Sequence, residues 1–158
     1  MADVRIRRAS PSDLAAVNAL FEELQGPHAD HYPQIFVRTG TEDYCRAVLG
    51  AEDHAVFVAE REAAIIGMAI AQLLDETSPH CFPMKLCRLN SIVVTEKARG
   101  TGAGRALIEE VEAFARQNGV RDLRLYVAEF NERAIELYER MGFRIRAHAM
   151  GKLIGETD

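Results

Sequence analysis

The feature that most constrains this chain is an apolar run that leads into a glycine-rich turn. The run covers residues 92–94, and the turn Arg99-Gly100-Thr101-Gly102-Ala103-Gly104 follows shortly after it. A helical pattern of apolar residues begins directly behind the turn. A strand, a glycine turn and a helix start in this order present free backbone N–H groups at the positive end of the helix dipole. The sequence therefore predicts a turn that binds a phosphate group.

Two arginines, Arg99 and Arg105, flank this turn. Cations are unfavourable at a helix N-terminus, and a bound pyrophosphate would reverse that penalty. A plain tight turn with two solvated arginines remains open on spacing alone. A Rossmann dinucleotide site is a weaker alternative, because Arg105 stands where its third glycine belongs. No Gly-Lys-Ser/Thr closes the turn, as a nucleoside triphosphatase loop requires.

Composition limits the class of protein. A length of 158 residues fits one domain over residues 1–158. The formal charge of -5 gives no electrostatic reason to bind nucleic acid or an anionic membrane. No signal peptide and no membrane-spanning run is visible, so we expect a cytoplasmic protein. The odd set Cys45, Cys81 and Cys87 is read as three reduced thiols.

Periodicity predicts an α+β fold with a mixed sheet and helices on both faces. Ser10 and Asp13 form a capping-box-like pair at the start of the first helix, and Gly26-Pro27 predicts its end. A second helix is expected from Thr41 to Gly50. The expected strands are 4–8, 54–59, 64–73, 85–94, 123–127 and 143–149, with 150–154 as a further extension.

Two motifs carry a resemblance to a known family. The first is Arg99, Gly102 and Gly104 behind an apolar strand, and the second is Asn131, Ala134 and Tyr138 followed by Gly142-Phe143. In this order the chain resembles the GCN5-related N-acetyltransferase (GNAT) superfamily. The resemblance implies a mostly antiparallel mixed sheet of six to seven strands with about four helices on both faces. It also implies acetyl-coenzyme A (acetyl-CoA) as co-substrate and no metal.

The resemblance assigns roles residue by residue. N–H groups from Gly100 to Arg105 would hold the pyrophosphate, and the preceding strand would splay from its neighbour at a bulge and pair with the pantetheine arm. Tyr138 would protonate the departing thiolate. A backbone N–H of that strand would polarise the thioester carbonyl. The implied cofactor-binding residues are Ile92, Val93, Val94, Arg99, Gly100, Thr101, Gly102, Ala103, Gly104, Arg105 and Asn131.

The general base is left open. Many relatives carry a glutamate on the strand before the turn, but Asn90 and Ser91 stand there in this chain. Glu76, His80, Glu129 and His31 are candidates elsewhere, and a water relay to a neutral amine is an equal alternative. The segment His28 to Phe36 is interpreted as a loop over the acceptor pocket rather than a metal site.

The leading hypothesis is an N-acetyltransferase that passes an acetyl group from acetyl-CoA to a primary amine of a small molecule or a protein. The alternative is a CoA-binding regulatory module without catalysis, which the missing strand glutamate motivates. Family analogy also implies a homodimer in which the last strands of two sheets pair. The acceptor amine and the acyl-chain preference remain open.

Overall fold

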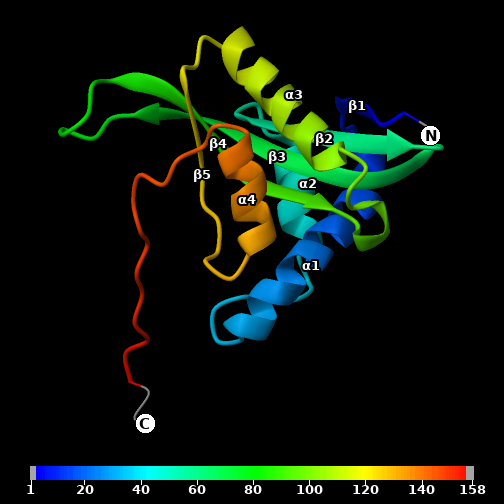
Figure 1. The fold of residues 1–158 in the computed structure, drawn as a ribbon, viewed down its shortest axis with the longest axis horizontal. Coiled ribbons are helices and arrows are strands. Elements are labelled where there is room, and N and C mark those ends of the chain that lie inside the picture. Colours follow the sequence, from blue (N-terminus) through cyan, green and yellow to red (C-terminus); the bar gives the residue numbers. More distant parts are fainter. Residues whose placement is uncertain (1–2, 156–158) are drawn as a thin grey trace. The chain divides into compact units, whose positions relative to one another are not determined.

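The computed structural model describes residues 3–155 (Figure 1). The chain divides into two compact units, residues 3–128 and 129–155 of the described part, and each is described by itself. Within the described residues, no helix is both long and apolar enough to cross a membrane. The expectation of a single domain over residues 1–158 stays a prediction.

The first unit is an α+β arrangement with one mixed sheet. Its elements in chain order are β1 (Arg5–Arg8), a 3₁₀ turn (Pro11–Asp13), α1 (Leu14–His31), α2 (Glu42–Gly50), β2 (His54–Arg61), β3 (Ala64–Glu76), β4 (Met84–Val94), a 3₁₀ turn (Glu96–Ala98), α3 (Ala103–Gln117) and β5 (Asp122–Leu125). The strands lie in the order β1-β2-β3-β4-β5. Neighbouring pairs are antiparallel except β4 and β5, which are parallel and joined through α3.

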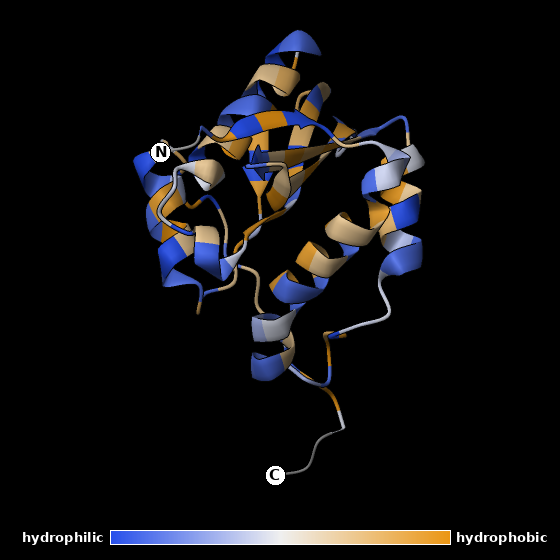
Figure 2. Cartoon of the chain, turned by 90° about the vertical axis from the view of Figure 1, so that its right-hand side faces the viewer, coloured by the Kyte–Doolittle hydropathy of each residue, from blue (hydrophilic) through white to orange (hydrophobic). Residues whose placement is uncertain are grey.

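Helices cover both faces of this sheet, as the periodicity predicted. In Figure 1, α3 lies in front of the sheet, and α1 and α2 lie behind it. Hydrophobic and hydrophilic residues are mixed along the helices, as expected for elements with one buried face (Figure 2). The core between the sheet and α1 and α2 contains Val17, Leu20, Cys45, Val48, Val56, Val58, Met68, Ile70 and Val93.

The opposite face of the sheet packs against α3. Leu107, Ile108 and Val111 of α3 are fully buried, as its apolar periodicity predicted. The ring of Phe114 lies edge-on to Phe57 of β2, with centroids 5.9 Å apart. Side chains alternate between faces along a strand, so Phe57 faces α3 while Val56 and Val58 face α1 and α2.

The predicted capping pair at the first helix is present and joins a larger ion-pair network. The Ser10 backbone N–H donates to Asp13 Oδ2 at 2.8 Å. Arg7 of β1 donates to both Asp13 oxygens, at 2.8 and 3.0 Å, and its Nε donates to Glu60 at 2.8 Å. Hydrogen bonds from Arg7 lower the pKa of Asp13 to about 2. This network ties the first helical turn to two strands.

The predicted end of the first helix at Gly26-Pro27 is wrong, because α1 continues through both residues to His31. A proline removes one backbone donor, but the rest of the ladder persists. The Tyr32 N–H donates to the His28 carbonyl at 2.8 Å. The His31 ring nitrogen Nδ1 lies 2.8 Å from the Pro27 carbonyl, which gives that group a partner as well.

The expectation of six to seven strands is also wrong for the described residues, whose sheet has five. Residues 143–149 and 150–154 form no strand. Their alternating pattern suits a strand, but a strand exists only where a neighbour accepts its hydrogen bonds. Ile145, Met150 and Ile154 are instead exposed, by 66%, 96% and 89%. The structure thus lacks, in this part, the last strands on which the homodimer expectation relied.

The second unit contains α4 (Glu132–Arg140). Asn131 caps this helix as predicted, because its Oδ1 accepts a hydrogen bond from the Ala134 N–H at 3.2 Å. Gly142 follows the helix with a positive φ of 92°, a conformation that glycine adopts readily. The Phe143 N–H donates to the Tyr138 carbonyl at 3.0 Å, which closes the helix end.

We predict that Asp13→Ala lowers the free energy of unfolding at pH 7 by about 1 to 2 kcal/mol, because it removes the partner of a half-buried arginine. The pKa of Asp13 falls from an ordinary 3.8 to about 2 on folding. Its stabilisation is therefore present above pH 3.8 and is lost as the pH falls through 2. Urea titrations across this range measure the effect. Asp43→Ala is the control, since Asp43 pairs with Arg46 on the surface.

A second prediction concerns Gly67, where β3 approaches β4 closely. A Cβ at this position would lie 2.8 Å from the Val93 carbonyl oxygen and 3.2 Å from Val94 Cγ2. We therefore expect Gly67→Ala to lower the free energy of unfolding by about 1 to 3 kcal/mol, because the strand backbone must shift. Gly50→Ala is the control, since open space surrounds its Cβ position. Equal stability of the two variants in urea would contradict this reading.

Candidate active site

The glycine turn joins the end of β4 to the start of α3. Gly100 and Gly102 have φ values of 80° and 86°, in the region that glycine tolerates best. A Cβ at either position would meet nothing within 4 Å, so open space lies next to the turn. The Thr101 hydroxyl donates to the Ala98 carbonyl at 2.7 Å and fixes the turn from within. Glycine is thus required here by backbone conformation, and the backbone stays accessible to a ligand.

The start of α3 carries free backbone donors. The helical ladder begins at Ala106, whose N–H donates to the Gly102 carbonyl at 3.0 Å. The N–H groups of Ala103, Gly104 and Arg105 precede that point, and no described residue accepts from them. No acidic residue lies in the first turn of α3, so the positive end of the helix dipole is not neutralised there. These features suit an anionic group such as a pyrophosphate.

The two predicted arginines lie at this end of α3. Arg99 directly follows the 3₁₀ turn, and its side chain is exposed. Arg105 Nε donates to Glu109 Oε1 at 2.8 Å, with the two side chains exposed by 72% and 53%. Exposed pairs of this spacing contribute only about 0.3–0.5 kcal/mol. Glu109 therefore holds Arg105 weakly, and a bound anion can compete for its guanidinium.

The strand before the turn has a bulge, as the family resemblance implied. Ile70 of β3 lies opposite Ser91, but Ala71 lies opposite Leu89, so Asn90 is the extra residue of β4. The Asn90 amide donates to Gln72 Oε1 at 3.1 Å. On its other side, β4 pairs with β5 only as far as Leu89, opposite Leu125. From Asn90 to Val94, β4 therefore has β3 on one side and no strand on the other among the described residues.

The direction of the β4 backbone groups follows from the ladder with β3. The Thr95 N–H donates to the Ile66 carbonyl at 2.8 Å, so residues in phase with Thr95 direct their polar groups toward β3. Val93 and Ser91 are in phase, and Val93 also packs in the core. Ile92 and Val94 are out of phase and direct their N–H and C=O groups to the side that β5 does not reach. Of the three predicted residues, these two offer a free strand edge.

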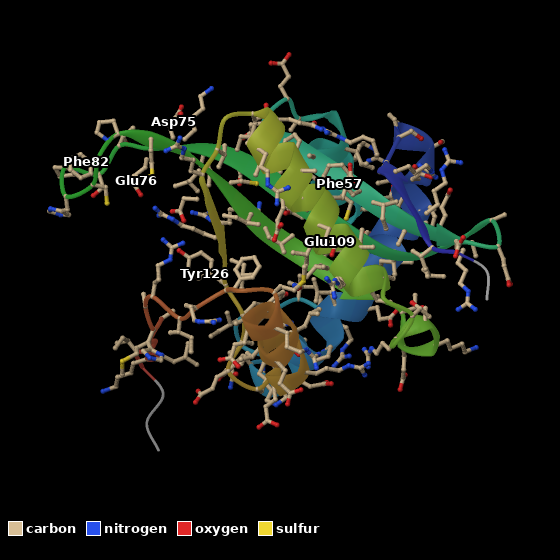
Figure 3. All side chains as sticks on the ribbon, turned by 45° about the horizontal axis from the view of Figure 1, so that its top comes forward. Phe57, Asp75, Glu76, Phe82, Glu109 and Tyr126 are labelled. Carbon is tan, nitrogen blue, oxygen red and sulfur yellow. The ribbon has the colours of Figure 1, made fainter. Side chains whose placement is uncertain are left out.

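The candidate bases differ in their surroundings. Glu76 lies near the end of β3 (Figure 3) and accepts hydrogen bonds from the Ser78 N–H at 3.0 Å and from Arg124 at 3.1 Å. These contacts lower the pKa of Glu76 and make it a weaker base. His31 ends α1, His80 lies in the loop before β4, and Glu129 belongs to the second unit. None of these positions identifies a base.

Asn131 and Tyr138 belong to the second unit. Tyr138 is buried, and its ring lies edge-on to Phe143 with centroids 5.7 Å apart. Burial raises the pKa of Tyr138 to about 12, so the phenol stays protonated at neutral pH and is a donor rather than a base. The cap and the ring contact give both residues a role in α4, which is compatible with a second role toward a ligand.

The segment His28 to Phe36 is partly helical rather than a loop throughout. His28 Nδ1 lies 3.0 Å from the Leu24 carbonyl, and both His28 and His31 lie on α1. The rings of His28 and Phe36 lie 5.2 Å apart. No group of three or more metal-ligating side chains occurs among residues 3–155. The three cysteines are free there, with Cys45 and Cys87 buried and Cys81 exposed.

One cluster was missed by the sequence analysis. Arg88 of β4 lies directly opposite Arg124 of β5, at the last pairs before the two strands part. Arg124 binds Asp122 at 2.6 Å and Glu76 at 3.1 Å. The Arg88 guanidinium lies 5.5 Å from the ring centroid of Tyr126, just beyond β5 (Figure 3). The register of parallel strands brings these residues together, and local patterns do not reveal it.

Comparison with known proteins places this geometry in a family. The acetyltransferase (GNAT) family matches residues 17–143. The chain is 30% identical over 140 residues to "Uncharacterized N-acetyltransferase YhfO" of Bacillus subtilis, with 89% of each chain covered. It is 28% identical to human "N-acetyltransferase 8B" over 72% of its own length and 48% of that protein. The chain belongs to the acetyltransferase (GNAT) family.

Solved structures show the same fold at lower identity. A tetramutant of the BH1408 protein from Bacillus halodurans superposes with a TM-score of 0.87 at 24% identity, covering 95% of this chain and 99% of that one. The aminoglycoside N-acetyltransferase AAC(6')-Iy, in complex with CoA, superposes with a TM-score of 0.77 at 19% identity, covering 98% and 97%. The described α+β arrangement is therefore a GNAT-like fold with a five-stranded mixed sheet.

We predict that Gly102→Glu abolishes stabilisation by CoA, because its carboxylate would stand at the free N–H groups of α3. For the unmodified chain, CoA at a hundred times its dissociation constant should stabilise the fold by about 2.7 kcal/mol. Gly119→Glu is a matched control, since Gly119 has a φ of 70° and open space at the other end of α3. Thermal unfolding with and without CoA measures both. An undiminished shift in Gly102→Glu would contradict the assigned turn.

Proposed function

We propose that this chain is an acetyl-CoA-dependent N-acetyltransferase that acts on a primary amine. The observation that carries the proposal is the free edge of β4, which leads into a turn and a helix start whose N–H groups have no acceptor among the described residues. One continuous segment thus offers strand hydrogen bonds at one end and an anion site at the other. The elongated CoA molecule, with a pyrophosphate and an amide-containing arm, has groups that match both.

The residues of the site have four roles in this proposal. The backbone from Gly100 to Arg105 binds the pyrophosphate, with Arg99 and Arg105 adding charge. Ile92 and Val94 pair with the pantetheine arm, and Val93 holds the strand in the core. Asn131 contacts the arm while capping α4. An N–H on the free edge of β4, for which Ile92 is the candidate, polarises the thioester carbonyl.

The reaction needs little covalent chemistry from the protein itself. Acetyl-CoA supplies an acyl carbon that the thioester already activates. The neutral amine nitrogen attacks this carbon, a C–N bond forms and the C–S bond breaks. The amine loses one proton and the departing thiolate takes up one, so the products are an amide and a free thiol. The chain provides position, a donor for the developing oxyanion, and proton transfer from Tyr138.

Several finer points belong to the same proposal. The acceptor is a small molecule or a protein amine, the working compartment is the cytoplasm, and residues 1–158 act as one domain. Structural neighbours support a small-molecule acceptor, because one is bound to a bisubstrate analogue, CoA-S-monomethyl-acetylneamine. The dinucleotide alternative predicts stabilisation by a nicotinamide dinucleotide and none by CoA.

The second candidate function is a CoA-binding regulatory module without catalysis. The observation that favours it is the amide Asn90 at the bulge, where a glutamate base is common in relatives. Glu76 does not replace it, because Ser78 and Arg124 already bind its carboxylate. Tight CoA binding without thiol release across a broad amine panel would support this module.

We predict that Tyr138→Phe lowers kcat about 100-fold, because it removes one hydroxyl donor of the proposed proton transfer. The ring contact with Phe143 is retained, so the free energy of unfolding and the dissociation constant of CoA should stay unchanged. Free thiol release from acetyl-CoA, at saturating amine, measures kcat.

Tyr44→Phe is the matched control, since Tyr44 packs on Phe21 with ring centroids 5.1 Å apart on α1 and α2. Its kcat should equal that of the unmodified chain. A Tyr138→Phe variant with unchanged kcat would remove Tyr138 from the proton transfer, although the glycine turn could still bind CoA.

A further inference from the structure

A polar cluster lies on one face of the sheet where β4 and β5 part. Arg88 lies opposite Gln72 of β3 on one side and opposite Arg124 of β5 on the other. Gln72 is in phase with Met68 and Ile70, so Arg88 and Arg124 point to the face that α1 and α2 cover elsewhere. All of these residues belong to the first unit.

The two arginines of this cluster differ in their carboxylate partners. Like charges directly opposite each other on neighbouring strands are destabilising. Arg124 is compensated, because Asp122 and Glu76 bind it at 2.6 and 3.1 Å. The charge of Arg124 is therefore already balanced by carboxylates, and those carboxylates are not available to attract a polycationic ligand.

Arg88 has no such compensation. Its Nε is buried and has no hydrogen-bond partner among the described residues. No ion pair joins its guanidinium to a described carboxylate, and its Cζ lies over the ring of Tyr126, 5.5 Å from the centroid. A partly buried cation with unused donors is costly unless an anion binds it. The guanidinium fork matches a carboxylate in shape and charge.

The position of Arg88 separates it from the pyrophosphate site. At about 3.3 Å per residue, Arg88 lies roughly 20 Å along β4 from Val94, where the strand leads into the glycine turn. It precedes the bulge residue Asn90 by two positions, and the free edge of β4 begins there. Arg88 therefore stands at the end of the free edge remote from the anion site of α3.

We propose that Arg88 binds a carboxylate of the acceptor, and that the acceptor is a primary amine that also carries a carboxylate, as an amino acid does. This inference rests on the proposed acetyltransfer and names its acceptor class. Tyr126 covers the guanidinium, Gln72 and Asn90 line the strand beside it, and Arg124 is kept out of the interaction by Asp122 and Glu76. Polycationic amines without a carboxylate would meet an uncompensated arginine.

The test compares amines that differ only in the carboxylate. Phenylalanine is paired with phenethylamine and lysine with cadaverine, and kcat/KM is normalised to the neutral fraction of each amine. The full chain should use the carboxylated member better by about 10- to 100-fold, the contribution of a hydrogen bond to a charged group. Arg88→Gln should lose this preference, keep its kcat/KM for phenethylamine and not lower its kcat/KM for cadaverine. Arg88→Lys should restore part of it.

Two controls keep the inference separable from the proposed function. Arg46→Gln removes an exposed arginine that pairs with Glu42 and Asp43 on α2, and it should leave the preference unchanged. Calorimetric binding of N-acetylphenylalanine and N-acetylphenethylamine, with CoA present, gives a readout that needs no turnover. Arg88→Gln should weaken only the carboxylated product, by about tenfold or more.

The outcomes are distinct. Amine turnover with no carboxylate preference, or an equal preference in Arg88→Gln, would overturn the role of Arg88 and leave the acetyltransferase standing. Equal binding of the two products to the unmodified chain would overturn it in the same way. Failure of CoA to stabilise the unmodified chain would instead count against the proposed function itself.

Discussion

The hydrogen-bond ladder between β3 and β4 is the constraint on which the rest of the site depends. β3 holds β4 along its whole length, while β5 leaves it after Leu89. The second half of β4 therefore keeps a defined direction although one edge is free. Gly67 allows the approach, since its missing side chain leaves room for the Val93 carbonyl. The glycine turn is in this way presented at the end of a fixed strand.

The features that the sequence predicted best are those that lie within a single element. The apolar stripe of α3, the strand at 85–94 and the capping residue Asn131 are local patterns within one element, and the structure confirms them. The remaining features of the fold depend on the hydrogen-bond partners that the surrounding residues and strands provide. Residues 143–149 alternate as a strand would, but alternation does not reveal whether another strand is available. Pro27 lies within α1 because a single missing donor is outweighed by the hydrogen bonds around it.

The candidate site also combines features that local sequence patterns predict with features that depend on neighbouring strands. The free N–H groups of α3 follow from residues close in sequence, whereas the bulge was expected only from the family resemblance. The Arg88 cluster depends on the register of β4 against β5, which α3 separates in the chain. Asn131 and Gly142 each have a structural role at an end of α4. Asn131 is its N-cap, and Gly142 follows its C-terminus with a positive φ. Their presence in a family motif therefore reports on helix boundaries as much as on chemistry.

The extra residue Asn90 decides on which face of the sheet the side chains before it lie. Side chains alternate between the two faces of the sheet along a strand, so one extra residue moves every side chain before it to the opposite face. With the insertion, Cys87 is fully buried and Arg88 shares the face of Gln72. If the same residues paired regularly from Ser91 without a bulge, Arg88 would lie opposite Leu73, and its guanidinium would enter the apolar interior beneath α3. The bulge therefore decides which face of the sheet Arg88 occupies.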